Sequence, residues 1–264
     1  MKRFLPLLAA ALFALAGCYT NPVTGRQSLV LVQPSQELAL GAQSFQAIRQ
    51  QEKVSTDAKM NERVKRVGER IAAAVGSEMP NAQWEFVVFD SPEVNAFALP
   101  GGKVGVYSGL LKLATTDDEL AIVMGHEIGH VVARHGAERM SEQMVIDGLG
   151  ALGDAYAQNH YSPQTVQLFE TAYGGATTVG RVLPHSRANE SEADHMGVVF
   201  AAQAGYDPRA AITFWKKMSE LKTTKPGLLD KFLSTHPADA QRIADLQALM
   251  PQVVPIYEAK RKNT

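Results

Sequence analysis

The chain has 264 residues, and its 26 basic and 27 acidic side chains give a formal net charge of −1. This balance gives no reason to expect nucleic-acid binding. Apolar residues make up 45% of the chain, enough for one compact domain with a sizeable core. Cys18 is the single cysteine, so no disulfide can form within the chain. The sequence shows no internal repeat and no low-complexity segment.

The first residues have the features of a secretory signal. Lys2 and Arg3 precede an apolar stretch, residues 4–16, that is too short for a comfortable membrane span. Leu-Ala-Gly-Cys at 15–18 has the form of a bacterial lipobox, and a lone cysteine in this position indicates a lipid attachment point rather than a thiol catalyst. We therefore expect a signal peptide over 1–17 and a lipid on Cys18. An uncleaved signal anchor is the alternative, and no second apolar run long enough to span a membrane follows.

Several elements are expected before the central motif. Residues 18–34 contain two prolines and a glycine and predict an extended tether. Helical patterns cover 35–51 and 57–75. Strand-like patterns cover 84–90 and 103–107, the second after a Pro-Gly-Gly turn.

The motif HEIGH, residues 126–130, predicts a zinc-hydrolase helix. His126 and His130 are four residues apart, so on a helix they project from one side and can share a metal. Glu127 can reach water bound to that metal, where a general base must lie. The flanking apolar positions are typical of a buried helix, with Asp117 and Asp118 expected as its N-terminal caps. The alternative is an ordinary core helix, which would leave several buried polar groups unsatisfied.

A catalytic zinc site takes three protein ligands and leaves one position for water. His135 lies nine residues after the first histidine of the motif and should point away from the metal, as a partly exposed residue near the helix end. In SRANESEADHMG, Glu190 and Asp194 share a helix face, whereas Glu192 faces the other way. We expect Glu190 to bind the metal and Asp194 to accept a hydrogen bond from a ligating histidine. A solvated acidic helix face is the alternative.

The remaining elements complete the expected fold class. Residues 148–180 are rich in small residues and poor in pattern, which predicts a mobile cover over the cleft. Further helices are expected to begin at Asp207-Pro208 and at Pro237, the last ending at Pro251 before a C-terminal tail over 251–264. These patterns predict an α+β chain, mainly α, with a small β-sheet beside the HEIGH helix.

Five segments together resemble a known family: NPVTGRQSLVLV, VNAFALPGGKVGVYSGLL, HEIGHVVARH, SRANESEAD and STHP. They are similar to the gluzincin peptidases that include HtpX and the CAAX prenyl endopeptidases, and most similar to the periplasmic lipoprotein members LoiP and BepA. The resemblance implies a zincin-type metallopeptidase domain over 35–250 and one Zn²⁺ per chain, held by His126, His130 and Glu190 with Glu127 as base. Two departures are that His185 replaces an aromatic residue often found before the SR pair, and that no tetratricopeptide repeats follow.

The resemblance also suggests roles for two other segments. Metallopeptidases commonly hold a peptide as an added strand at a sheet edge, so we assign 96–107 to substrate binding, with Asn95, Ala96 and Ala98 as contact residues. A plain core hairpin is the alternative. His236, on an extended or turn segment before Pro237, is expected in the active site. It would either donate to the oxyanion or occupy the open metal position in a resting enzyme. A loop histidine that caps the helix is the alternative.

The expected function is a zinc endopeptidase of the bacterial periplasm that degrades misfolded or unassembled envelope proteins. By resemblance, Tyr19 after the cysteine implies sorting to the outer membrane, on its inner leaflet. The alternative is a lipoprotein that assists outer-membrane protein assembly, with proteolysis secondary. Hydrolysis of an amide or ester in a small molecule is a third possibility. The presence of Glu127 argues against a pure binding protein, because a scaffold would have no need of a general base.

Overall fold

A computed structural model describes residues 17–146, 164–165, 186–225, 227–237 and 240–262. Most of the expected signal peptide and of the expected cover over 148–180 lies outside the described residues, as does His185. Within the described part, no helix combines the length and apolar character that crossing a membrane requires.

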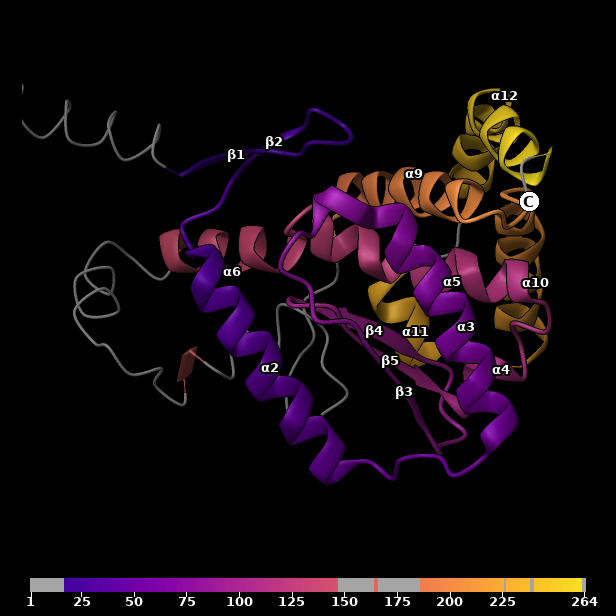
Figure 1. Ribbon diagram of the computed structural model, residues 1–264, viewed down its shortest axis with the longest axis horizontal. Coiled ribbons are helices and arrows are strands. Elements are labelled where there is room, and N and C mark those ends of the chain that lie inside the picture. Colours follow the sequence, from indigo (N-terminus) through magenta and orange to yellow (C-terminus); the bar gives the residue numbers. More distant parts are fainter. Residues whose placement is uncertain (1–16, 147–163, 166–185, 226, 238–239, 263–264) are drawn as a thin grey trace, which may run out of the picture.

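A three-stranded sheet forms the base of the domain (Figure 1). Its order is β3 (Glu85–Phe89), β5 (Lys103–Tyr107) and β4 (Ala96–Leu99), with β3 parallel and β4 antiparallel to β5. The strands expected at 84–90 and 103–107 are therefore confirmed to within a residue. The turn between β4 and β5 needs glycine, because Gly101 and Gly102 have φ values of 87° and 82°.

Helices make up most of the described residues, which confirms the expected fold class. The expected helices at 35–51 and 57–75 are present as α2 and α3, and α5 and α9 run beside each other across the sheet (Figure 1). The helices are α2 (Pro34–Gln51), α3 (Ala58–Val75), the 3₁₀ turn η1 (Gly76–Glu78), α4 (Ser108–Leu111), α5 (Asp117–Val132), α6 (His135–Ile146), α9 (Arg187–Gln203), α10 (Ala210–Thr224), α11 (Asp230–Thr235) and α12 (Ala240–Lys262).

The start of α5 differs from the expected capping. Thr116 is the N-cap: its hydroxyl accepts a hydrogen bond from the Glu119 amide at 3.1 Å, and the Glu119 carboxylate accepts from the Thr116 amide at 3.4 Å. This reciprocal capping box satisfies two amides that the helix itself cannot pair. Asp117 and Asp118, expected as caps, lie instead in the first turn, where their charge complements the helix dipole.

Glycines allow α5 and α9 to approach closely. A Cβ atom added to Gly125 would lie 2.8 Å from the carbonyl oxygen of Gly197, and one added to Gly197 would lie 2.7 Å from the backbone nitrogen of His126. Neither contact could be relieved by side-chain rotation, because the opposing atoms belong to the backbone. The approach brings the first turn of α9, which carries Glu190, against the HEIGH turn of α5.

The segment after Cys18 is not an extended tether. Strands β1 (Cys18–Thr20) and β2 (Gln27–Leu29) pair in an antiparallel hairpin, which we call the N-terminal hairpin, residues 18–29. Its turn includes Gly25 at φ 73°, and the Tyr19 hydroxyl donates to the Val132 carbonyl at 2.8 Å. This hydrogen bond joins residues that are far apart in the sequence, and it holds the hairpin against the C-terminal end of α5.

The C-terminal helices also differ from expectation at their ends. Helix α10 begins at Ala210, after a turn that contains Asp207 and Pro208. Helix α12 continues through Pro251 and Pro255 to Lys262 instead of ending at Pro251. Both prolines are exposed, so water can reach the face on which a proline leaves a carbonyl group without its amide partner.

Candidate metal centre and active site

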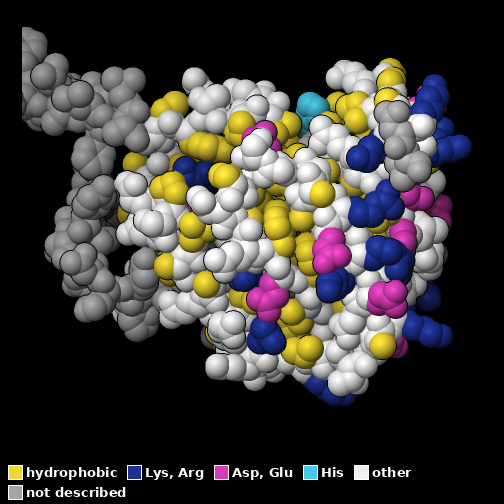
Figure 2. Space-filling view, viewed as in Figure 1, with side chains coloured by type: hydrophobic (Ala, Val, Ile, Leu, Met, Phe, Trp, Pro, Cys, Tyr) yellow, Lys and Arg dark blue, Asp and Glu magenta, His cyan; other side chains and the backbone are white. Residues whose placement is uncertain are grey.

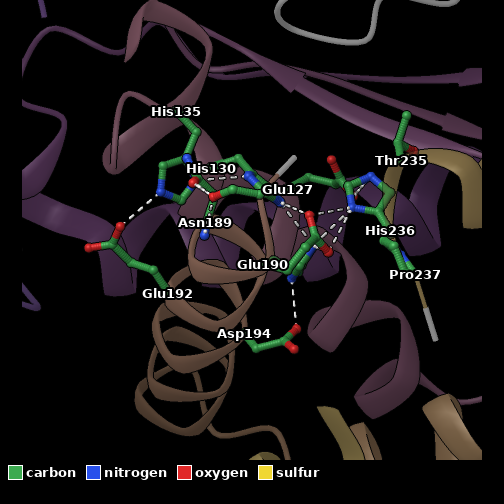
Figure 3. A network of polar contacts seen from close by, with 12 residues as sticks. Glu127, His130, His135, Asn189, Glu190, Glu192, Asp194, Thr235, His236 and Pro237 are labelled. Carbon is green, nitrogen blue, oxygen red and sulfur yellow. Dashed lines mark hydrogen bonds and ion pairs between the residues drawn. The ribbon is translucent and has the colours of Figure 1, made fainter. Parts of the chain in front are cut away.

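Four buried side chains from three parts of the fold converge on one point (Figure 3). His126 and His130 lie on α5, and Glu190 lies in the first turn of α9. His236 is the C-cap residue of α11. One donor atom from each lies within 4.8 Å of the others. The described residues thus contain a compact cluster of three imidazoles and one carboxylate.

The spacing of the donor atoms suits a zinc ion. The Nε2 atoms of His126 and His130 are 3.0 Å apart; Glu190 Oε1 lies 3.2 Å from Nε2 of His130, and Glu190 Oε2 lies 3.4 Å from Nε2 of His126. His236 Nδ1 lies 3.2 Å from His126 Nε2 and from Glu190 Oε1. Donors about 2.0–2.1 Å from a tetrahedral zinc are separated by roughly 3.3–3.4 Å. Imidazole and carboxylate are also ligand types that zinc takes, so these residues fit the ion.

His126 is oriented by a buried carboxylate and arginine. Its Nδ1 lies 2.8 Å from Asp194 Oδ1, the contact expected from the spacing of Glu190 and Asp194. Arg242 donates to both oxygens of Asp194, at 2.6 and 2.7 Å. Burial raises the pKa of Asp194, but Arg242 and His126 more than offset this and hold the pKa below its usual value. The ionised Asp194 accepts from Nδ1–H of His126 and leaves Nε2 of His126 facing the cluster.

His130 is oriented by a second chain of contacts. Its Nδ1 lies 2.8 Å from Nδ1 of His135, and Nε2 of His135 lies 2.8 Å from Glu192 Oε2. Burial raises the pKa of Glu192, but hydrogen bonds from His135, Thr24 and Arg26 lower it to about 2. Glu192 faces away from the possible metal ligands, as expected, but its side chain is buried and not solvated.

The expectation for His135 was wrong. His135 is fully buried and begins α6, whereas a partly exposed position near the end of α5 was expected. Helix α5 ends at Val132, and Arg134 adopts a φ of 57°, so the helical projection from His126 does not extend to His135. The turn instead brings the His135 ring back to that of His130, although outside the group of possible metal ligands.

Glu127 lies beside the cluster without a hydrogen bond to its Oε1 atom among the described residues. The Nε2 atom of His236 is 3.5 Å from this oxygen, too far for a good hydrogen bond. Burial raises the pKa of Glu127, with smaller opposing effects of His236 and His126. A buried carboxylate that lies beside a group of possible metal ligands and has an oxygen without a hydrogen bond is placed to exchange a proton with water or substrate.

Arg242 was not predicted from the sequence. Besides Asp194, its guanidinium contacts a Glu190 oxygen at 3.0 Å, and its Cζ atom lies 3.4 Å above the Trp215 ring. It neutralises part of the buried negative charge behind the cluster. The available signal was its position in the first turn of a helix that follows STHP, six residues after His236.

The strand assigned to substrate contact lies at one edge of the described sheet. Ala96 and Ala98 belong to β4, which pairs on one side with β5 and packs against α5. Asn95 precedes this strand, and its carbonyl oxygen accepts from the Tyr107 amide at 3.0 Å. Cys18 is exposed at the start of β1, outside this site.

The mainly helical fold, the two-histidine helix and the carboxylate from a second helix define a zincin-type metallopeptidase domain. The comparison with known families agrees with this class. Residues 58–250 match peptidase family M48, and the chain belongs to that family.

Relatives of the chain come from mitochondria and from bacteria. The chain is 37% identical over 189 residues to the mitochondrial metalloendopeptidase OMA1 of Schizosaccharomyces pombe, covering 72% of this chain and 52% of that protein. It is 29% identical over 281 residues to that of Saccharomyces cerevisiae, covering 97% and 76%. It is 28% identical over 242 residues to the beta-barrel assembly-enhancing protease of Escherichia coli, covering 90% and 48%. The chain thus spans about half the length of the first and third of these relatives.

Proposed function

We propose that the chain is a zinc-dependent endopeptidase. The observation that carries the proposal is the cluster of donor atoms at zinc spacing, with the buried Glu127 carboxylate beside it, whose Oε1 atom has no hydrogen-bond partner among the described residues. His126, His130 and Glu190 hold the metal, and Asp194 fixes the orientation of His126. The names of the relatives, metalloendopeptidase and protease, support the same reaction.

In this proposal the zinc ion activates water and substrate, and Glu127 carries out the proton transfers. A zinc ion at this site supplies a Lewis acid that polarises a carbonyl group and makes water more acidic. Glu127 takes a proton from the attacking water and returns it to the leaving amine. Its raised pKa suits this role, since a group that holds the proton between two steps must not be too weak a base.

His236 occupies the fourth corner of the cluster in the described arrangement. Its Nδ1 atom lies 3.2 Å from both His126 Nε2 and Glu190 Oε1, close to the spacing of a fourth zinc ligand. Of the two roles considered for His236, this geometry favours a resting form in which the ring closes the site. The oxyanion-donor role requires the ring to leave this position.

A peptide substrate would bind along β4. No described strand pairs with the outer edge of β4, so the backbone groups of that edge are the ones an added strand would use, which would give affinity without strong sequence demand. Asn95, Ala96 and Ala98 are the contact residues in this proposal. Polypeptides are therefore the expected partners, and a small-molecule amide or ester is less favoured.

For location and substrate, we propose an envelope protein of a bacterium, anchored through a lipid on Cys18 to the inner leaflet of the outer membrane. The lipobox and the similarity to bacterial beta-barrel assembly-enhancing proteases support this proposal, whereas the OMA1 relatives are mitochondrial. Misfolded or unassembled envelope proteins are the proposed substrates. The same bacterial relatives favour assistance of outer-membrane protein assembly as the second function.

The test of the proposed function is the substitution Glu127→Gln. It should abolish casein cleavage while zinc stays near one per chain, because Glu127 moves protons and is not a ligand. Glu69→Gln, at an exposed glutamate of α3, is the matched control and should cleave normally. Unchanged cleavage by Glu127→Gln would refute the mechanism. Proteins that remain bound to the inactive variant then separate degradation of misfolded proteins from assembly of outer-membrane proteins.

A further inference from the structure

The two histidines of α5 are each backed by a buried carboxylate that an arginine holds. His126 contacts Asp194, which in turn accepts from Arg242. The series of contacts from His130 is longer, because His135 lies between His130 and Glu192 (Figure 3). The arginine that completes this second chain, Arg26, belongs to the N-terminal hairpin. The hairpin thus contacts the far end of a path that leads to the metal cluster.

The chemistry of the groups fixes the direction of each hydrogen bond along this path. An ionised carboxylate only accepts, so Glu192 accepts from Nε2–H of His135. The Nδ1 atom of a neutral His135 then carries a lone pair and accepts from Nδ1–H of His130. His130 is left with its Nε2 lone pair pointing at the cluster, 3.2 Å from Glu190 Oε1. One carboxylate therefore selects the tautomer of two successive rings.

The N-terminal hairpin supplies most of the donors that hold Glu192. Asn21 Nδ2 donates to Oε1 at 2.8 Å, the Thr24 hydroxyl donates to the same oxygen, and Arg26 Nε donates to Oε2. Arg26 also makes a two-bond contact with Glu138 of α6, at 2.8 and 2.7 Å. Asn21 and Glu192 are both buried. Three hairpin residues and His135 thus surround this carboxylate and fix its orientation.

We propose that the N-terminal hairpin, acting through Glu192 and His135, positions His130 for zinc. Glu192 and His135 are positioning residues, and the segment that begins at Cys18 is a structural part of the metal centre. The inference rests on the proposed ligation of zinc by His130. The competing role for Glu192 is to anchor the hairpin alone, which would leave zinc affinity unchanged.

The test measures the dissociation constant of Zn²⁺ for the full chain by competition with a chelator of known affinity. Glu192→Ala and His135→Phe should each weaken zinc binding by about 10- to 100-fold, the usual effect of removing a group that orients a ligating histidine. Glu85→Ala is the control: Glu85 of β3 also pairs with an arginine, Arg49, but that pair has no part in the path through Glu192. Its zinc affinity should stay within about threefold of the parent chain, since the path through Glu192 is intact.

A double-substitution cycle separates positioning from anchoring. If Glu192 acts through His135, adding Glu192→Ala to His135→Phe should weaken zinc binding no further. Parent-like affinity in both single variants, or fully additive effects, would overturn the inference. If either variant fails to fold, Arg26→Leu, at the partly exposed end of the path, should still lower zinc affinity. A parent chain that binds no zinc, or undiminished binding by His130→Ala, would instead refute the proposed ligand set and so the proposed function.

Discussion

Glu190 and Glu192 are two positions apart on α9 and face different partners. Glu190 contacts the cluster through His126, His130 and His236, whereas Glu192 contacts His135 and the N-terminal hairpin. We predict that Glu190→Gln loses zinc, because an amide is a much poorer ligand than a carboxylate. Glu192→Gln should remain loaded at saturating zinc, since its amide oxygen can still accept from His135. Metal analysis after equilibration with excess zinc decides the matter, and the reverse pattern would show that the assigned ligand is wrong.

His236 gives a prediction about the direction of a rate change. If the ring closes the site at rest, His236→Ala should cleave substrate faster than the parent chain or cleave itself, with zinc still bound by the other three ligands. If the ring donates to the oxyanion, kcat should fall by about 100- to 1000-fold with little change in KM. The observed Nδ1 position predicts the first result. Kinetics identical to those of the parent chain would exclude both roles.

Helical spacing alone predicted the pairs of site residues that lie within one helix, whereas the expectation for His236 needed the family resemblance. The four-residue spacing of His126 and His130 requires only that α5 be helical, and the same holds for Glu190 and Asp194 on α9. The position of His135 was predicted wrongly because it was projected from His126 along a helix, whereas α5 ends at Val132, before His135. The sequence does not reveal the role of Arg242 either, since only the packing of α12 on α9 brings it to Asp194.

At the scale of elements, the contact between α5 and α9 decides whether the ligands meet. We predict that Gly197→Ala lowers both thermal stability and zinc affinity, because the new Cβ would lie 2.7 Å from the His126 backbone nitrogen and push the helices apart. Overpacking of this kind typically costs about 1–3 kcal/mol. It opposes the gain of about 1 kcal/mol that alanine brings within a helix.

Thermal unfolding with and without zinc checks this prediction. Ser191→Ala, at an exposed position of the same helix, is the control and should change neither the melting temperature nor zinc binding appreciably. A higher melting temperature for Gly197→Ala, as helix propensity alone would give, would show that the close approach has room for a methyl group.

Local patterns predicted α2, α3, β3 and β5 almost to the residue, because apolar periodicity along the chain records which face each element buries. The N-terminal hairpin escaped prediction for the opposite reason. Its fixing contacts, such as that of Tyr19 with Val132 and that of Arg26 with Glu192, join residues more than 110 positions apart. The proline rule failed at Pro251 because the cost of a proline depends on whether water reaches the freed carbonyl group.

At the scale of the whole molecule, basic side chains and the proposed lipidation site, Cys18, lie apart. Lys and Arg side chains gather, with Asp and Glu side chains among them, on the side of the molecule near the end of α12, whose last residues are Lys260, Arg261 and Lys262 (Figure 2). Strand β1, with Cys18, lies away from that end (Figure 1). A lipid on Cys18 would therefore bring the N-terminal hairpin side to the membrane first. The basic end of α12 is better explained as a solvated surface than as a second membrane contact.

The anchor itself supplies the last prediction. Cys18→Ala should no longer take up labelled palmitate, because Cys18 is the only cysteine of the chain, and it should lose its partition with membranes if the proposed lipid is the anchor. A chain that begins at Tyr19 should still fold and cleave casein, since Asn21, Thr24 and Arg26 remain to hold Glu192. A chain that begins at Val30 lacks these three donors and should need a higher zinc concentration for the same activity.

If the Tyr19 chain were inactive although folded and zinc-loaded, the lipid would have a role in the reaction beyond location. If the Val30 chain bound zinc as tightly as the Tyr19 chain, the N-terminal hairpin would be no part of the metal centre.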